Sequence, residues 1–184
     1  MQKEQIIMDQ NRYIYIILSY SGTFPARLIR AVSQKEYSHA SISLDKRLDE
    51  FYSFGRKKVN NPLIGGFVIE KKCEGVYKKY PMTYCKVLRL EVPQDVYQKI
   101  QGEIDDFLSE RNRFRYSFMG LLLAGINIYR PRKYYMYCSE FVRLVLSNSG
   151  IDMSTLPKVC RPCDFFNLPN SSVVYTGLLN NYSA

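Results

Sequence analysis

Tryptophan is absent from this chain, histidine occurs once and cysteine occurs five times. Because His39 is the one histidine, any chemistry that depends on an imidazole has to use it. An odd number of cysteines does not suit a complete disulfide framework, and reducing compartments keep thiols free. We therefore expect free thiols.

Long apolar runs are also missing. The longest one, over residues 118–129, is too short to span a bilayer and is typical of a buried segment. The first twelve residues, MQKEQIIMDQNR, are polar and mixed in charge, unlike a secretory leader. These absences favour a cytoplasmic protein without a transmembrane segment.

The chain does have enough length and hydrophobicity for a core, with 184 residues of which 46% are hydrophobic, 16 of them tyrosines. It contains no repeat, low-complexity tract or linker, so we expect one domain over residues 1–184. The net charge of +9 would suit an anionic surface. The basic residues are scattered, however, which disfavours a nucleic-acid partner.

Hydrophobic periodicity predicts strands first and helices later. The expected strands cover residues 12–20, a hairpin over 38–44 and 50–55, then 65–72, 83–92 and 171–179. The expected helices cover residues 25–33, 93–114, all or part of 117–128, and a segment that begins at Cys138 and ends near Gly150. This segregation indicates an α+β fold in which a mostly antiparallel sheet packs against helices.

Cys138 begins the last of these helices, where it shares one helix face with Phe141, Val142 and Val145. One reading is a small buried residue of the core. The other is a nucleophile, because the N–H groups and the dipole of a first helical turn favour a thiolate. The same N–H groups could stabilise an oxyanion.

A thiolate nucleophile needs a base and a group that orients the base. His39 starts the predicted hairpin, either as a general base or as a plain strand residue. With a two-residue turn at 46–47, Ser41 faces Tyr52, so Tyr52 and Glu50 project from the His39 face. Tyr52 is the better placed orienter and Glu50 the stronger one by charge, and both could simply face solvent.

Two blocks, His39-Ala40-Ser41-Ile42 and Tyr137-Cys138-Ser139-Glu140-Phe141-Val142, carry a family resemblance. With a polar residue on a strand between them, they resemble the permuted papain-like cysteine hydrolases of the NlpC-like superfamily. In that group the histidine precedes the cysteine, as it does here.

The resemblance implies a fold in which a sheet carrying the histidine packs against a helix headed by the cysteine. It implies that Cys138 attacks an amide, peptide or acyl bond through a covalent acyl-enzyme, with His39 as general base. The third position in the family is commonly histidine, glutamate or glutamine. Tyr52 lies nearest to that position in this sequence, with Glu50 as the alternative.

Other readings remain open. Cys160 and Cys163 form a CxxC that could bind zinc with Cys73 and Cys85, although a turn at Pro162 is the simpler reading. We expect no metal and no cofactor. The chain could also be a non-catalytic module that binds an anionic partner through its basic surface. It could instead be an acyl-lipid transferase that uses the same cysteine and histidine.

Overall fold

The computed structural model describes residues 11–21 and 36–184. Six antiparallel strands form the main sheet, in the spatial order β4 (Asn61–Glu70), β3 (Phe51–Lys58), β2 (His39–Ser43), β1 (Arg12–Tyr20), β5 (Tyr84–Val92) and β8 (Ser171–Leu178). A short parallel pair joins β6 (Arg115–Tyr116) to β7 (Tyr135–Met136). The helices are α3 (Gly75–Lys79), α4 (Gln94–Ser109), α5 (Phe118–Gly125) and α6 (Cys138–Asn148), with 3-10 turns η1 (Pro162–Asn167) and η2 (Leu179–Asn181). The fold class is therefore α+β, as predicted.

The strands expected from periodicity match β1 to β5 and β8, and the expected later helices match α4, α5 and α6. The short helix α3 and the β6–β7 pair were not predicted, because each is too short for a periodic signal. The predicted helix over 25–33 and most of the polar N-terminal segment lie outside the described residues. Among the described helices, none is long and apolar enough to cross a bilayer.

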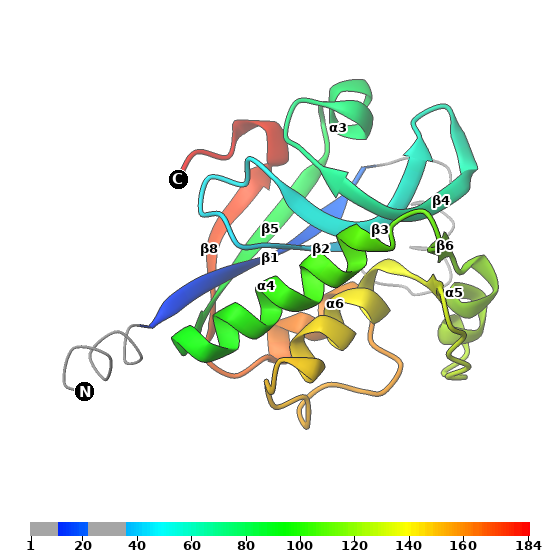
Figure 1. The fold of residues 1–184 in the computed structure, drawn as a ribbon. Helices are drawn as coiled ribbons and strands as arrows, with labels where there is room; N and C mark the ends of the chain where they lie inside the picture. Colours follow the sequence, from blue (N-terminus) through cyan, green and yellow to red (C-terminus); the bar gives the residue numbers. More distant parts are fainter. Residues whose placement is uncertain (1–10, 22–35) are drawn as a thin grey trace.

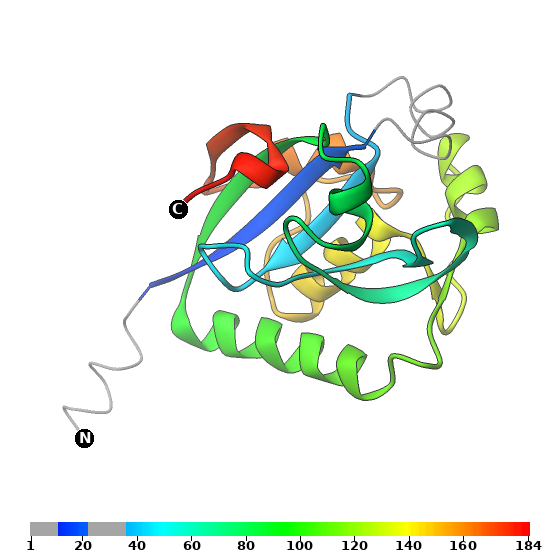
Figure 2. The same cartoon turned by 90° about the horizontal axis from the view of Figure 1, so that it is seen from above.

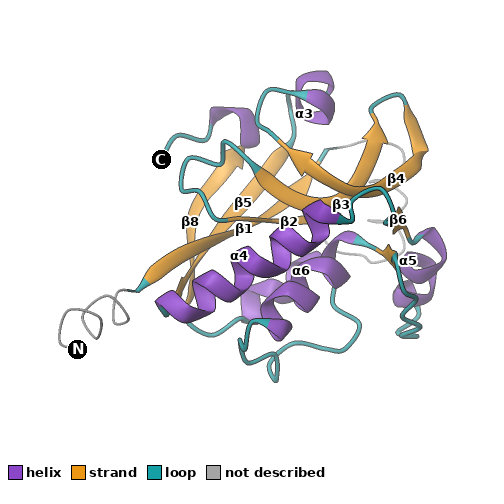
Figure 3. Cartoon of the chain, in the orientation of Figure 1, coloured by secondary structure: helices purple, strands orange, loops and turns teal. Residues whose placement is uncertain are grey.

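The sheet lies between two layers, with α4 and α6 on one face and α3 with η2 on the other (Figures 1 and 3). Successive side chains of strand β1 point to opposite faces of the sheet, so β1 contributes residues to the cores on both sides. Ile14, Ile16 and Leu18 join a core with α4 and α6, whereas Tyr15 and Ile17 face the second core. The larger core contains an aromatic cluster of Phe54, Phe67, Phe107, Phe114 and Phe141.

The hairpin register differs from the prediction by one residue. The structure pairs Tyr52 with Ile42, not with Ser41. The turn is longer than two residues because the Asp45 carboxylate accepts hydrogen bonds from the amides of Arg47 and Asp49, at 3.0 and 2.9 Å. A shift of one residue moves every side chain of a strand to the other face, so the predicted facing was wrong for Tyr52.

Helix α5 and the β6–β7 pair lie at the end of the molecule away from both chain termini, beside the β3–β4 turn (Figures 1 and 2). Strand β4 packs against β6, and the contact is close: a Cβ on Gly65 would lie 2.7 Å from the Cβ of Tyr116. Strand β7 leads directly into α6. This arrangement brings α5 close to the first turn of α6.

Candidate active site

Cys138 is the first residue of α6, as predicted, and 1% of its surface is exposed. Tyr137 before it is extended, and its amide donates to the Glu140 carboxylate at 3.4 Å, which defines the helix start. Phe141 and Val142, one turn later, are fully buried and anchor the helix in the core. The helix packs against β2 and β3, so its first turn meets the sheet near the start of β2.

His39, the first residue of β2, forms a hydrogen bond with the Cys138 thiol. Strand β2 pairs with β3 only at Ile42 and Tyr52, so the two strands are no longer paired at His39. The backbone N–H groups of Ala40 and Ser139 also donate to the sulfur. The structure thus brings together the two side chains that the sequence singled out, although 98 residues lie between them in the chain.

These contacts decide the ionisation of the thiol. Burial raises the pKa of Cys138, but the hydrogen bond and charge of His39, followed by the two amides, outweigh burial and lower it. A thiolate at the first turn of a helix also gains from the helix dipole. The site therefore favours the charged sulfur.

The second ring nitrogen of His39 faces a carboxylate. Its Nε2 lies 3.1 Å from Oε2 and 3.2 Å from Oε1 of Glu70, the last residue of β4. Burial opposes a charged imidazole, but the Glu70 charge and the Cys138 contact raise the pKa of His39 to about 10. Because Glu70 occupies Nε2, Nδ1 is left for the thiol. The result is a thiol–imidazole–carboxylate array.

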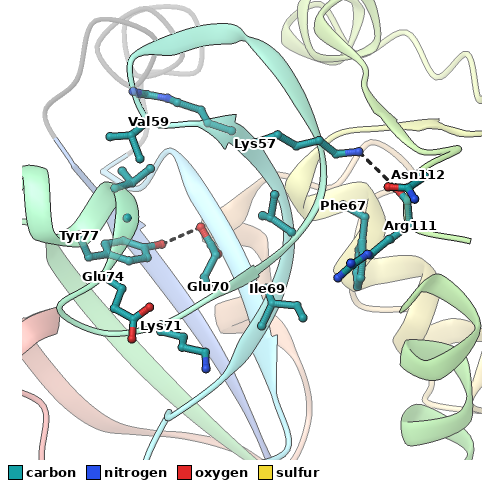
Figure 4. Close-up of a pocket in the computed structure, with 14 residues that line it drawn as sticks. Lys57, Val59, Phe67, Ile69, Glu70, Lys71, Glu74, Tyr77, Arg111 and Asn112 are labelled. Carbon is teal, nitrogen blue, oxygen red and sulfur yellow. Dashed lines mark hydrogen bonds between the residues drawn. The ribbon is translucent and has the colours of Figure 1, made fainter. Parts of the chain in front are cut away.

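Glu70 is itself held by hydroxyl groups. Ser41 donates to Oε2 at 2.7 Å and Tyr77 donates to Oε1 at 3.1 Å, the latter drawn in Figure 4. Burial raises the pKa of Glu70, yet the charge of His39 and these hydrogen bonds lower it overall. The carboxylate therefore stays ionised beside the imidazole, with its position fixed by α3 and β2.

Tyr52 and Glu50 do not contact His39, which corrects the predicted orienter. The Tyr52 hydroxyl lies 3.5 Å from Glu50, whose carboxylate pairs with Lys71 at 3.0 Å. The Tyr52 ring stacks on Phe67 over the larger core. The longer turn explains this outcome, since it places Tyr52 on the opposite face of the sheet from His39.

Sequence reasoning did not identify Glu70. The available signal was a carboxylate within the predicted strand over 65–72, which follows the predicted hairpin in the chain. In the structure Glu70 pairs with Phe51, so both side chains project from one face of the sheet. The contact of Glu70 with His39 depends on the register of three strands, β2, β3 and β4, whereas the hairpin pattern in the sequence concerns only β2 and β3.

Tyr116 is a second residue that the sequence did not reveal. Its hydroxyl forms a hydrogen bond with the Cys138 thiol, and it sits in β6, immediately before α5. Burial and the charge of Cys138 raise the pKa of Tyr116, so the hydroxyl keeps its proton and acts as a donor. No spacing rule links a tyrosine at this position to a cysteine 22 residues later.

A cavity of about 460 Å³ lies on the other side of Glu70, between β3, β4, α3 and the segment after α4 (Figure 4). Glu70 and Tyr77 line it, together with basic side chains including Lys57, Lys71 and Arg111. Lys57 donates to the Arg111 carbonyl at 3.2 Å. Cys138 and His39 are not among its lining residues, so this cavity reaches the carboxylate and not the thiol.

The remaining cysteines do not gather. Cys160 and the partly buried Cys163 belong to the core under α4 and α6, whereas Cys85 belongs to the core on the opposite face and Cys73 is exposed. Within residues 11–21 and 36–184, no group of three or more histidine, cysteine, aspartate or glutamate side chains could hold a metal ion. The zinc reading of the CxxC therefore has no support in this part of the chain.

Comparison with known proteins gives no significant similarity, whether to protein-family models, to curated proteins or to solved structures.

Proposed function

We propose that this chain is a cysteine hydrolase with a permuted papain-like fold, which cleaves an amide, peptide or acyl bond. The observation that carries the proposal is the array of Cys138, His39 and Glu70 at the first turn of α6. A nucleophile next to a base, with the base held by a third group, is the arrangement that covalent catalysis requires.

In the proposed first step, the Cys138 thiolate attacks the carbonyl carbon of the substrate. The carbonyl oxygen becomes an oxyanion, which the N–H of Cys138 in the first turn of the helix would bind. The carbon–nitrogen or carbon–oxygen bond then breaks, and the imidazolium of His39 gives its proton to the leaving amine or alcohol. The product of this step is a thioester on Cys138.

In the second step, His39 takes a proton from a water molecule, which attacks the thioester. The carbon–sulfur bond breaks, the acid leaves, and the thiolate and imidazolium are restored. Glu70 keeps Nε2 of His39 occupied, so Nδ1 faces the sulfur, and its negative charge stabilises the imidazolium. A carboxylate stabilises the imidazolium more than the hydroxyl of Tyr52, which the sequence favoured, because the carboxylate carries a negative charge.

Acyl transfer to a lipid or an amine would use the same residues, with an alcohol or amine in place of water in the second step. A non-catalytic binding module would need none of this chemistry. The reactivity of Cys138 separates the binding module from both enzyme readings.

The test is acylation of the protein by p-nitrophenyl butyrate, chosen as a small ester because Cys138 is 1% exposed. We expect release of p-nitrophenolate and a butyryl adduct on Cys138 by mass spectrometry, both lost in Cys138→Ala. Cys163→Ala, which removes a partly exposed thiol outside the array, should behave as wild type. An unmodified Cys138, or equal turnover by Cys138→Ala, would contradict the proposal.

A further inference from the structure

The surface formed by α5 and the residues that follow it is strongly apolar. No charged residue occurs between Tyr116 and Tyr129. Large hydrophobic side chains of this segment are 38–66% exposed, namely Phe118, Met119, Leu122, Ile126, Ile128 and Tyr129. We call these six residues the α5 apolar surface. An exposed apolar cluster of this kind marks an interaction site more often than an isolated exposed leucine does.

The β3–β4 turn extends the same surface. Leu63 and Ile64, at the start of β4, are also exposed, and β4 packs against β6, the strand that comes before α5 (Figure 1). Gly65 of β4 lies close against Tyr116 of β6, two residues before α5 begins. Two separate segments therefore present large apolar side chains at one end of the molecule.

Basic side chains border the α5 apolar surface. Arg130, Arg132 and Lys133 follow it directly, and Arg115 precedes it. Arg132 lies over the Tyr135 ring at 4.2 Å and Lys133 over the Tyr134 ring at 5.2 Å, which keeps these cations next to aromatic groups. All four basic residues are exposed. The surface thus combines an apolar tip with a cationic border.

We propose that the α5 apolar surface inserts into the interface of an anionic lipid bilayer. Apolar side chains enter the boundary between headgroups and acyl chains, while arginine and lysine pair with anionic headgroups. Tyrosines at the border suit the same depth. The charge of the border argues for an anionic lipid surface over a second copy of this chain, because two identical cationic borders would repel each other.

The position of the surface links it to the thiol. Tyr116, which contacts Cys138, lies two residues before the start of α5, and Cys138 follows strand β7, which pairs with β6. Docking through α5 would therefore hold Cys138 near the bilayer. That Cys138 would then react with lipid acyl groups rests on the proposed function. Docking of the α5 apolar surface to a bilayer does not depend on it.

The absence of tryptophan gives a clean probe. Leu122→Trp, in the full chain, is mixed with vesicles of phosphatidylcholine that contain about 30% phosphatidylglycerol. We expect a blue shift of the emission and quenching by brominated acyl chains. Val173→Trp on β8, also an exposed apolar position, is the matched control and should show neither change.

Binding is then measured by co-sedimentation with the same vesicles. Leu122→Asp combined with Ile126→Asp should abolish binding, and Val173→Asp should not. Replacing Arg130, Arg132 and Lys133 by Gln should weaken binding about 100-fold, from roughly fivefold for each charge near an anionic surface. Cys138→Ala should bind as wild type, so a failure of the thiol chemistry is distinguishable from a failure of docking.

Three results would overturn the proposal. The first is no change in Leu122→Trp emission with vesicles, and the second is unaltered sedimentation of the Leu122→Asp, Ile126→Asp variant. The third is a blue shift that needs no vesicles and grows with protein concentration, which would assign the surface to a second copy of the chain.

Discussion

Cys138 and Cys160 are equally buried, each with 1% of its surface exposed, yet the pKa values of their thiols are shifted in opposite directions. Burial and the charge of Asp164 raise the pKa of Cys160 well above its ordinary value. The pKa of Cys138 is lowered. The two residues are close in space, because the Ser139 hydroxyl donates to the Cys160 carbonyl at 2.7 Å.

Burial alone does not decide whether a cysteine is a core residue or a nucleophile. Both thiols have lost water, which favours the neutral form. Cys138 has gained an imidazole, a tyrosine hydroxyl and two backbone amides, whereas the Cys160 sulfur contacts the Arg161 carbonyl at 3.6 Å, which offers no positive charge. The partners of the sulfur make the difference.

His39→Ala should abolish the difference in thiol pKa between Cys138 and Cys160, and we expect it to change the reactivity of Cys138 more than any other substitution. Without the imidazole, burial raises the pKa of Cys138 as it does that of Cys160. We expect the alkylation rate of Cys138 by iodoacetamide at pH 6 to fall about 100-fold, because the thiolate is the nucleophile and its population falls. The rate is measured per cysteine by mass spectrometry, and the slow Cys160 serves as the internal control. An unchanged Cys138 rate would show that His39 does not activate it.

Glu70→Gln should lower the pKa of His39, and we expect its effect on the Cys138–His39 pair to be second only to that of His39→Ala. The pKa of His39 is raised to about 10, so the imidazolium persists as pH rises through neutrality and is lost only as pH passes that value. Removing the carboxylate charge lowers this pKa and narrows the range of pH in which the ion pair exists. NMR titration measures the shift without ambiguity, because the chain has one histidine.

Glu50→Gln is the matched control for Glu70→Gln, since Glu50 pairs with Lys71 and not with His39. It should leave the His39 titration unchanged. If Glu50→Gln lowered the His39 pKa and Glu70→Gln did not, the sequence-based assignment would be correct and the assignment to Glu70 wrong.

Tyr116→Phe should reduce the thiolate population of Cys138, but by less than the two preceding substitutions. The hydroxyl donates one hydrogen bond to the sulfur, and such a bond contributes about 1 kcal/mol, or roughly fivefold in thiolate population. The alkylation rate of Cys138 at pH 6 should fall by about that factor. Tyr52→Phe, which removes a hydroxyl that does not reach Cys138, should have no effect. Equal rates for both variants would exclude Tyr116 from the site.

Glu140 is an acid in the same helical turn as Cys138, and for this carboxyl group burial prevails. Burial raises the pKa of Glu140 to about 7, although the Tyr137 amide opposes the shift. The folded state therefore binds the proton more tightly than the unfolded chain, and stability falls as pH rises from about 4.5 through 7. Glu140→Gln should remove this fall, raising the free energy of unfolding at pH 8 more than at pH 5. Denaturant titrations at both pH values measure it, and equal changes would contradict the assignment.

Much of this arrangement could be predicted from local patterns. The 3.6-residue period places Cys138 at the start of α6, and β-branched runs predict β1 and β5, because each signal lies within one segment. Glu70 and Tyr116 could not be found in this way. Their contacts depend on the register across β2, β3 and β4 and on the packing of β6 against β4, which no local pattern encodes.

The ion pair of Cys138 and His39 is tested most directly by the pH dependence of the alkylation of Cys138 in the native protein. Cys160 and Cys85 are followed in the same sample. Burial raises the pKa of Cys85 to about 12, so it provides a second inert reference. The proposed ion pair predicts that Cys138 reacts fast below pH 7 while both references stay unmodified. A Cys138 that reacts only above about pH 8.5, or only after unfolding, would contradict the claim and identify it as a residue of the core.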